Sequence, residues 1–88
     1  MNWTLSWKPD IRRELHLLWV SAPDSVAVRA ASDSIEQALL GDPTGNGEHF
    51  SEGLWRIVVV PLVVHYTVDE TIRHVEITDC ARTRDIHT

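Results

Sequence analysis

Residues 53–68 read GLWRIVVVPLVVHYTV, and this stretch decides the fold. Two apolar runs rich in valine lie on either side of Pro61. Valine branches at its β carbon, so it suits a pleated strand better than a helix. Proline cannot donate a hydrogen bond to a neighbouring strand, which makes Pro61 a turn or an edge position. We therefore predict two adjacent strands, Leu54 to about Val60 and Leu62–Val68.

Two amphipathic helices are predicted before this stretch, because apolar residues recur there at helical spacing. Pro9 suits the first position of the first helix, and Pro23 ends it. Asp24 or Ser25 can cap the second helix, and Gly41 can end it in the left-handed conformation. The expected apolar stripes are Ile11, Leu15, Leu18, Trp19 and Ala22 in the first helix, and Val28, Ala31, Ile35, Ala38 and Leu39 in the second.

Two further strands are predicted at the ends of the chain. Residues 3–7, WTLSW, alternate between apolar and polar side chains, as a half-buried strand does. After the polar turn Asp69–Thr71, the segment from about Arg73 to Thr78 alternates in the same way. The segment Asp42–Glu52, rich in glycine and polar residues, is predicted to be a loop.

The predicted fold is therefore α+β, with the order β-α-α-β-β-β. The helices form a hairpin that packs on one face of a four-stranded, mainly antiparallel sheet. The 88 residues are expected to make a single domain. Function is expected on the other face of the sheet, which would carry Arg56, His65, Thr67, His74, Glu76 and Thr78.

Composition indicates which partners the protein is expected to bind and in which cellular compartment it is expected to lie. Eight Lys and Arg oppose thirteen Asp and Glu, for a formal net charge of −5, which on average repels phosphate backbones. Cys80 is the only cysteine, so an internal disulfide is excluded and a reducing cytoplasm is expected. The first residues, MNWTLSWKPD, lack the pattern of a signal peptide. No apolar run approaches the roughly 18–20 residues that cross a bilayer, so we expect no membrane partner.

A few polar residues are candidates for a site. Arg56 is either a phosphate ligand or a solvated strand arginine whose stem covers apolar surface. His65 and His74 could face each other on adjacent strands, as proton carriers or as a cross-strand polar pair. Their spacing with Cys80 lacks the short ligand pairs of zinc sites, so neither a metal nor a cofactor is expected. Asp79 disfavours the neighbouring thiolate, which makes Cys80 a small strand residue rather than a nucleophile.

The chain resembles the RelE/ParE superfamily of toxins from bacterial toxin–antitoxin systems, over about residues 3–82. The resemblance rests on the order of the elements and on several short patterns. These are Leu18–Trp19 in the first helix, LLGDP at 39–43, GLWRI at 53–57, YTV at 66–68, VEI at 75–77, and the basic residues Arg82 and Arg84 near the end.

The resemblance implies an antitoxin as partner and one of two activities. RelE-like members cut messenger RNA on the ribosome without a metal, whereas ParE-like members inhibit DNA gyrase. For the first activity, Arg56, Arg82 and Arg84 would bind RNA. The catalytic set would be Arg56 and Arg82, which stabilise phosphate charge, with His65 and His74 as proton carriers, and we expect these four residues to cluster on one face of the sheet.

A third function stays open, namely a catalytically inactive binding module with the same fold. Many active members carry a Tyr-Arg pair where this chain has Leu62 and Val63. Active members also tend to be basic and to carry several lysines, whereas Lys8 is the only lysine here. The sequence also leaves the oligomeric state open, including a homo-oligomer.

Overall fold

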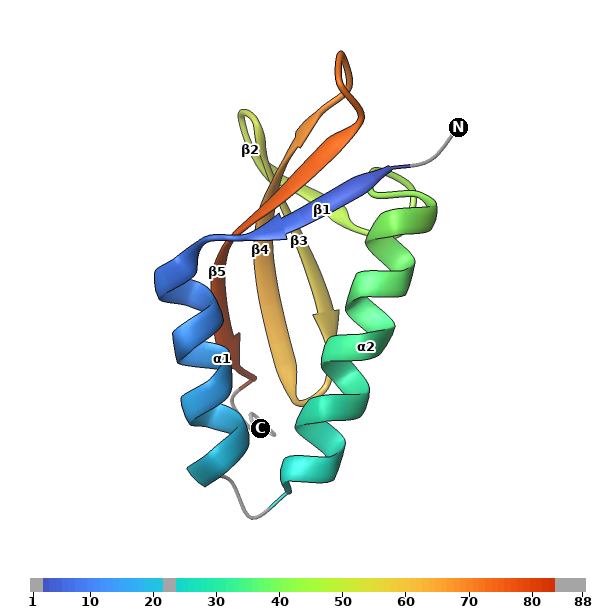
Figure 1. Ribbon diagram of the computed structural model, residues 1–88. Helices are drawn as coiled ribbons and strands as arrows, with labels where there is room; N and C mark the ends of the chain where they lie inside the picture. The colour runs from blue at the N-terminus through green and yellow to red at the C-terminus, as the bar shows by residue number, and fades with distance from the viewer. Residues whose placement is uncertain (1–2, 22–23, 84–88) are drawn as a thin grey trace.

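Helices and strands follow one another as the sequence predicts, with one added strand. The computed structural model describes residues 3–21 and 24–83 (Figure 1). Its elements are β1 (Thr4–Trp7), α1 (Pro9–Ser21), α2 (Ser25–Gly41), β2 (Glu48–Ser51), β3 (Leu54–Val59), β4 (Leu62–Asp69) and β5 (His74–Arg82). Neither helix, within the described residues, is long and apolar enough to cross a membrane.

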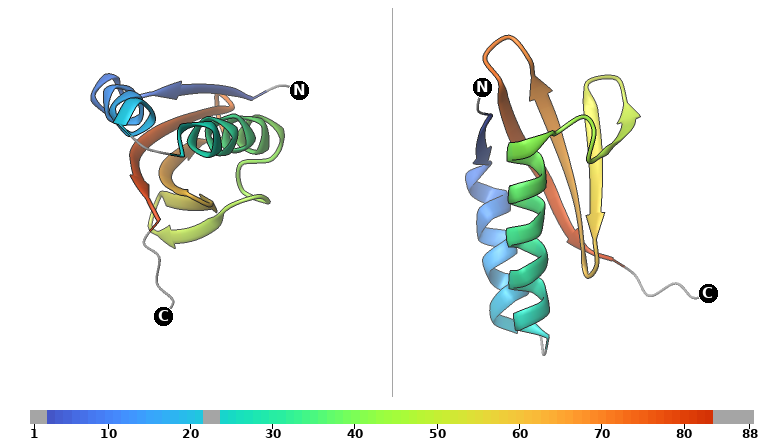
Figure 2. Two further views of the ribbon diagram at one scale, coloured as in Figure 1. Left: turned by 90° about the horizontal axis from the view of Figure 1, so that it is seen from below. Right: turned by 90° about the vertical axis from the view of Figure 1, so that its right-hand side faces the viewer.

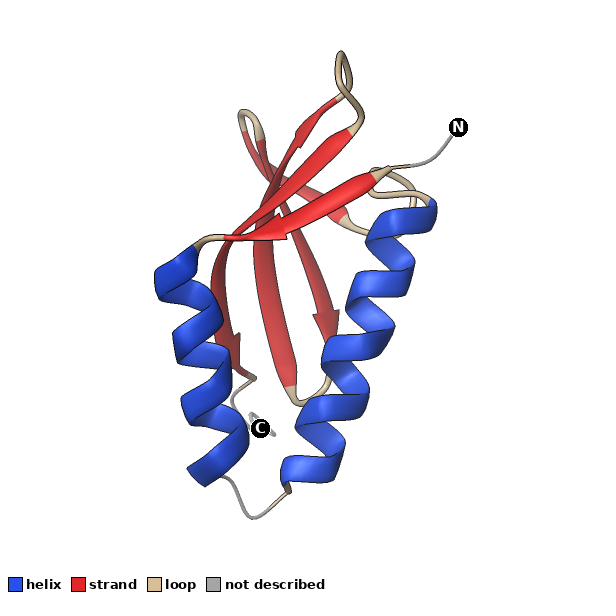
Figure 3. Cartoon of the chain, in the orientation of Figure 1, coloured by secondary structure: helices blue, strands red, loops and turns tan. Residues whose placement is uncertain are grey.

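The five strands form one sheet in the order β1-β5-β4-β3-β2. β1 runs parallel to β5, and the other pairs are antiparallel. Figure 3 distinguishes the two helices from the strands, and the right-hand view of Figure 2 shows both helices on the same side of the sheet, which confirms the predicted helical hairpin on one face. We call the opposite side of the sheet the open face.

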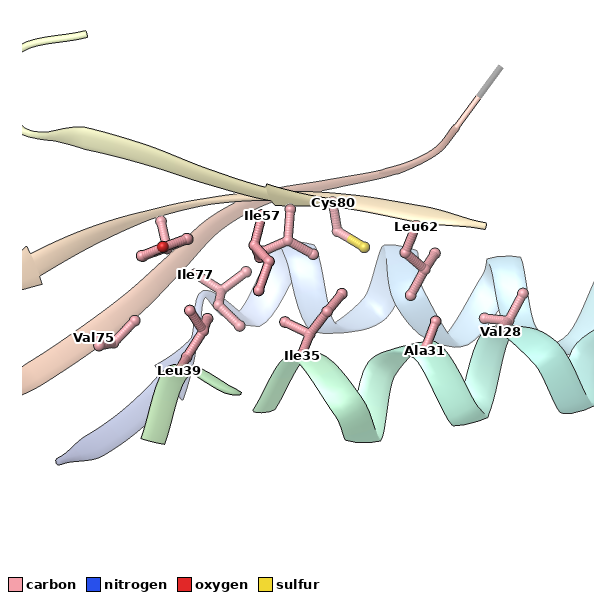
Figure 4. Close-up of a cluster of buried hydrophobic side chains, with 11 residues drawn as sticks. Val28, Ala31, Ile35, Leu39, Ile57, Leu62, Val75, Ile77 and Cys80 are labelled. Atoms are coloured by element: carbon pink, nitrogen blue, oxygen red, sulfur yellow. The ribbon is translucent and has the colours of Figure 1, made fainter. Parts of the chain in front are cut away.

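The core lies between α2 and the middle of the sheet (Figure 4). The predicted stripe of α2 is confirmed, because its apolar residues are the most deeply buried of either helix. The stripe of α1 and the four tryptophans are only partly buried and surround this centre. The buried apolar residues are Val28, Ala31, Ile35, Leu39, Ile57, Leu62, Val64, Tyr66, Val75, Ile77 and Cys80.

Two strand boundaries differ from the prediction. Glu48–Ser51, expected to lie in a loop, forms the edge strand β2, which pairs with β3 through a hairpin. Gly53 closes this hairpin with φ +74°, a conformation that suits glycine. β5 continues to Arg82 rather than ending near Thr78. A shift of register between β4 and β5 adds one extra residue to β5 after Ile77. The alternation of apolar and polar side chains breaks at that residue, so a period-two pattern does not reveal the rest of the strand.

The helix ends agree in part with the expected signals. α1 begins at Pro9 and Pro61 lies in the turn between β3 and β4, as predicted. Gly41 is still helical and does not take the left-handed conformation, so the predicted glycine cap is wrong. Asp24 holds the N-cap position of α2, but its side chain makes no capping hydrogen bond. Residues 22 and 23 lie outside the described part of the chain.

Candidate functional site on the open face of the sheet

Four ionisable residues line up across the open face. Glu48 pairs with Arg56, Arg56 pairs with His65, and His65 pairs with Asp79. Directly paired residues place their side chains on the same face of a sheet. We call this set, which spans β2 to β5, the charged row. It contains two of the predicted site residues, Arg56 and His65, each next to a carboxylate that was not predicted to belong to a site.

Arg56 is held by its neighbour on the edge strand. Its Nε donates to Oε1 of Glu48 at 2.9 Å, and its Nη2 contacts the same oxygen. The Phe50 ring lies 5.1 Å from the guanidinium carbon, within the range of a cation–π contact. The Arg56 side chain remains 36% exposed. A phosphate that binds there would therefore reach the guanidinium but compete with Glu48.

His65 lies between an aromatic ring and a carboxylate. Its Nδ1 is 3.6 Å from Oδ2 of Asp79, and its ring meets Phe50 edge to face at 4.9 Å between centroids. The shift of register after His65 brings Asp79 opposite it, and Thr78 donates to the His65 carbonyl oxygen at 3.4 Å. The bulged residue thus turns Asp79 outward, beside the imidazole.

His74 lies elsewhere on the open face, at the start of β5. Its Nδ1 is 2.7 Å from the Thr4 hydroxyl, and its Nε2 is 2.9 Å from the Ser6 hydroxyl. In the β4–β5 register His74 pairs with Asp69, far along the strand from His65. The prediction that His65 and His74 could face each other is therefore wrong. Both nitrogens of His74 already have hydroxyl partners on β1.

Arg82 lies on the helix-covered side of the sheet. It pairs with Leu62, whose side chain is in the core, and its two terminal nitrogens bind both carboxylate oxygens of Asp24 at 3.0 Å. This bidentate contact lowers the pKa of the Asp24 carboxyl and raises the pKa of the Arg82 guanidinium. The expectation that Arg82 shares a face with Arg56 is wrong. Arg84 lies outside the described residues.

The two remaining reactive groups are buried. The Tyr66 hydroxyl donates to the Pro43 carbonyl at 2.6 Å, and burial, with a contribution from Asp42, raises its pKa to about 12. Burial, followed by the charges of Asp79 and Glu14, raises the pKa of the Cys80 thiol to about 11. Both groups stay protonated at neutral pH. Among residues 3–21 and 24–83, no three His, Cys, Asp or Glu residues cluster as metal ligands would.

The charged row places a cation and an imidazole beside the exposed ring of Phe50. An imidazole can carry a proton near neutral pH, and a guanidinium can stabilise charge on a phosphate. Sequence reasoning missed Glu48 and Phe50 because their strand has only four residues and was expected to be a loop. The Glu52–Gly53 pair just before the apolar strand was the available signal, since glycine there is typical of a hairpin turn.

Comparisons with known proteins support the fold. No family model and no curated protein matches the sequence. A chain of the RelBE2 toxin–antitoxin complex from Mycobacterium tuberculosis superposes with a TM-score of 0.76 at 19% identity, covering 93% of this chain and 99% of that one. A chain of the archaeal RelE–RelB complex from Pyrococcus horikoshii gives 0.70 at 14% identity, with 98% and 100% covered. A double arginine-to-alanine mutant of Escherichia coli RelE in the free state gives 0.65 at 14% identity, with 93% and 84% covered.

Proposed function

We propose that this chain, which has the fold of the RelE toxins, is the toxin component of a toxin–antitoxin pair. The observation that carries the proposal is the similarity of fold along 93–98% of the chain to solved RelE and RelE–RelB structures. One fold can host several activities. The similarity therefore supports an antitoxin partner more strongly than any particular reaction.

The reaction that we propose is cleavage of messenger RNA at Arg56 and His65. These two residues are paired on neighbouring strands and partly exposed on the open face. His65 would take the proton of the ribose 2′-hydroxyl as that oxygen attacks the phosphorus, and Arg56 would stabilise the charged phosphate. The bond from phosphorus to the 5′ oxygen would break, and the leaving oxygen would take a proton from solvent. RNA would have to displace Glu48 from Arg56. An ion pair at the surface contributes at most about 1 kcal/mol, so a bound phosphate can compete with it.

A second candidate function is a binding module without catalysis. Arg56 and Arg82 are each engaged by a carboxylate, and they lie on opposite sides of the sheet. The two cations therefore do not converge on a common phosphate. This arrangement favours a protein that binds its partner or target and performs no chemistry on RNA.

Expression of the chain alone in a bacterium tests both candidates. An active toxin stops growth and shortens messenger RNA, and Arg56→Ala or His65→Ala restores both. Arg12→Ala removes an exposed arginine from α1 and is the matched control, with no relief expected. An arrest that persists with both open-face variants rejects cleavage at this site, and a DNA-damage response with intact messenger RNA indicates gyrase instead. The absence of any arrest supports the binding module.

A further inference from the structure

The imidazole of His65 is held on one side and free on the other. Its Nδ1 lies 3.6 Å from Oδ2 of Asp79, and the Phe50 ring packs edge to face against it at 4.9 Å between centroids. The side chain is only 21% exposed, so these neighbours restrict its rotation. Its Nε2 has no hydrogen-bond or ion-pair partner among the described residues. One ring nitrogen thus faces a carboxylate, and the other remains available.

The chemistry of the partner decides which nitrogen carries the proton. A neutral imidazole holds one N–H, and an ionised carboxylate can only accept hydrogen bonds. The proton of His65 is therefore expected on Nδ1, facing Asp79, which leaves the lone pair on Nε2. His74 shows the contrast, because its two nitrogens meet the hydroxyl groups of Thr4 and Ser6 at 2.7 and 2.9 Å. A hydroxyl can donate or accept, so either tautomer of His74 satisfies both contacts.

Asp79 reaches the imidazole only because β5 contains a bulge. Tyr66 pairs with Ile77. The preceding residue of β4, His65, pairs with Asp79, which leaves Thr78 as the extra residue. With regular alternation Asp79 would point into the core, as Ile77 does. Bulges often re-aim a side chain next to a functional site. This one places a carboxylate beside the imidazole that a regular strand would have lacked.

We propose that Asp79 is a positioning residue, which holds the proton of His65 on Nδ1 and leaves Nε2 bare for a substrate. Its part in catalysis rests on the proposed function. There Nε2 takes the proton of the ribose 2′-hydroxyl as the 2′ oxygen bonds to phosphorus, and the 5′ oxygen leaves with a proton from solvent. Nδ1 keeps its proton throughout, and the Asp79 carboxylate offsets the charge of the imidazolium. The position of the proton in the free protein does not depend on that function.

The ring nitrogens of the full chain, labelled with ¹⁵N-histidine, test this proposal. Spectra are recorded at about pH 9, where imidazole is neutral, and the nitrogen shifts distinguish a protonated ring nitrogen from a bare one. We expect His65 to carry its proton on Nδ1. Asp79→Asn should move the proton to Nε2 in most molecules, because the carboxamide can donate to Nδ1. Asp79→Glu, which keeps a carboxylate, should leave it on Nδ1.

Matched controls separate this role from a general effect of charge or folding. Asp33→Asn removes a carboxylate from an exposed position on α2 and should leave the proton of His65 on Nδ1. The ring signals of His74 should be the same in every variant, since its hydroxyl partners lie on β1. The dispersion of the amide spectrum shows whether each variant is folded, and the wild-type spectrum alone already decides between the two tautomers of His65.

A chain that cleaves messenger RNA allows a second measurement. Asp79→Asn should lower kcat by about tenfold or more and leave KM for the RNA within about twofold, because Asp79 acts through His65 and not on the RNA. Asp79→Glu should recover part of the loss.

Three results would overturn the proposal. The first is a proton on Nε2 of His65 in the wild type, and the second is a proton that stays on Nδ1 in Asp79→Asn. The third is an equal kcat for an active wild type and Asp79→Asn. A wild type that neither arrests growth nor cleaves messenger RNA rejects the proposed cleavage instead, and the ring nitrogens then decide the role of Asp79 by themselves.

Discussion

Replacing Tyr66 by Phe removes one oxygen from the interior and leaves a buried carbonyl without its partner. The Tyr66 side chain is fully buried, its hydroxyl donates to the Pro43 carbonyl at 2.6 Å, and Pro43 is also buried. An unpaired buried polar group costs about 1–3 kcal/mol. We predict that Tyr66→Phe lowers the free energy of unfolding by that amount at pH 7, with an unchanged m value.

The difference in free energy of unfolding between the wild type and Tyr66→Phe should also depend on pH. Burial raises the pKa of the Tyr66 hydroxyl from its ordinary value of 10.0 to about 12, so the folded state holds this proton more tightly than the unfolded state. The resulting stability is complete below pH 10 and is lost as pH rises through 12. The full loss, reached once the pH exceeds the folded-state pKa of Tyr66, amounts to about 3 kcal/mol. Phenylalanine has no such proton, so the advantage of the wild type should shrink above pH 10.

Urea unfolding followed by circular dichroism, at pH 7, 9, 11 and 12, measures this difference directly. The Cys80 thiol, with a pKa raised to about 11, is present in both proteins and cancels from the comparison. A variant as stable as the wild type at pH 7 would show that the Pro43 carbonyl does not depend on this hydroxyl. A difference that stays constant up to pH 12 would show that the hydroxyl is not buried in the folded state.

Three further changes follow from the packing and the ion pairs. Ile35→Ala, at a fully buried position, should lower the free energy of unfolding by about 2–5 kcal/mol in urea titrations. Leu40→Ala, at a position that is 42% exposed, should lower it by less than about 1 kcal/mol, and equal effects would contradict the assigned core. Gly47→Ala should lower the melting temperature, because a Cβ there would overlap a buried hydroxyl, and an unchanged value would refute the close packing of this loop. The contact of Asp24 with Arg82 stabilises the fold only while the carboxyl is charged, so this stability is lost as pH falls through the lowered pKa of Asp24. Arg82→Ala should make the loss of stability in acid shallower, and the same acid dependence in both proteins would refute the contact.

The hydrophobic pattern was sufficient to predict the layers of the fold. The α2 stripe and the apolar strands on either side of Pro61 have strong periodicity, and they became the core. β2 was not predictable in this way, because EHFS is short and exposed and is held as an edge strand by pairing with β3. A four-residue strand gains its stability from its neighbour and not from its own sequence.

The candidate site was less predictable than the fold, because it depends on register. Arg56 and His65 were expected on the open face and do lie there. Arg82 was expected on the same face, but the extra residue at Thr78 reverses the alternation and turns Arg82 toward Asp24. A single bulge moves every later side chain of a strand to the other face. Sequence periodicity alone contains no signal for that change.

The parallel pairing of β1 with β5 has a consequence for biosynthesis. Thr4 contacts His74 across 70 positions of sequence, so β1 cannot pair until β5 is available. Contacts between such distant positions form late and slow folding. A chain emerging from the ribosome therefore cannot complete its sheet until β5 has been synthesised. Whatever depends on the finished sheet is thereby postponed until β5 has left the ribosome.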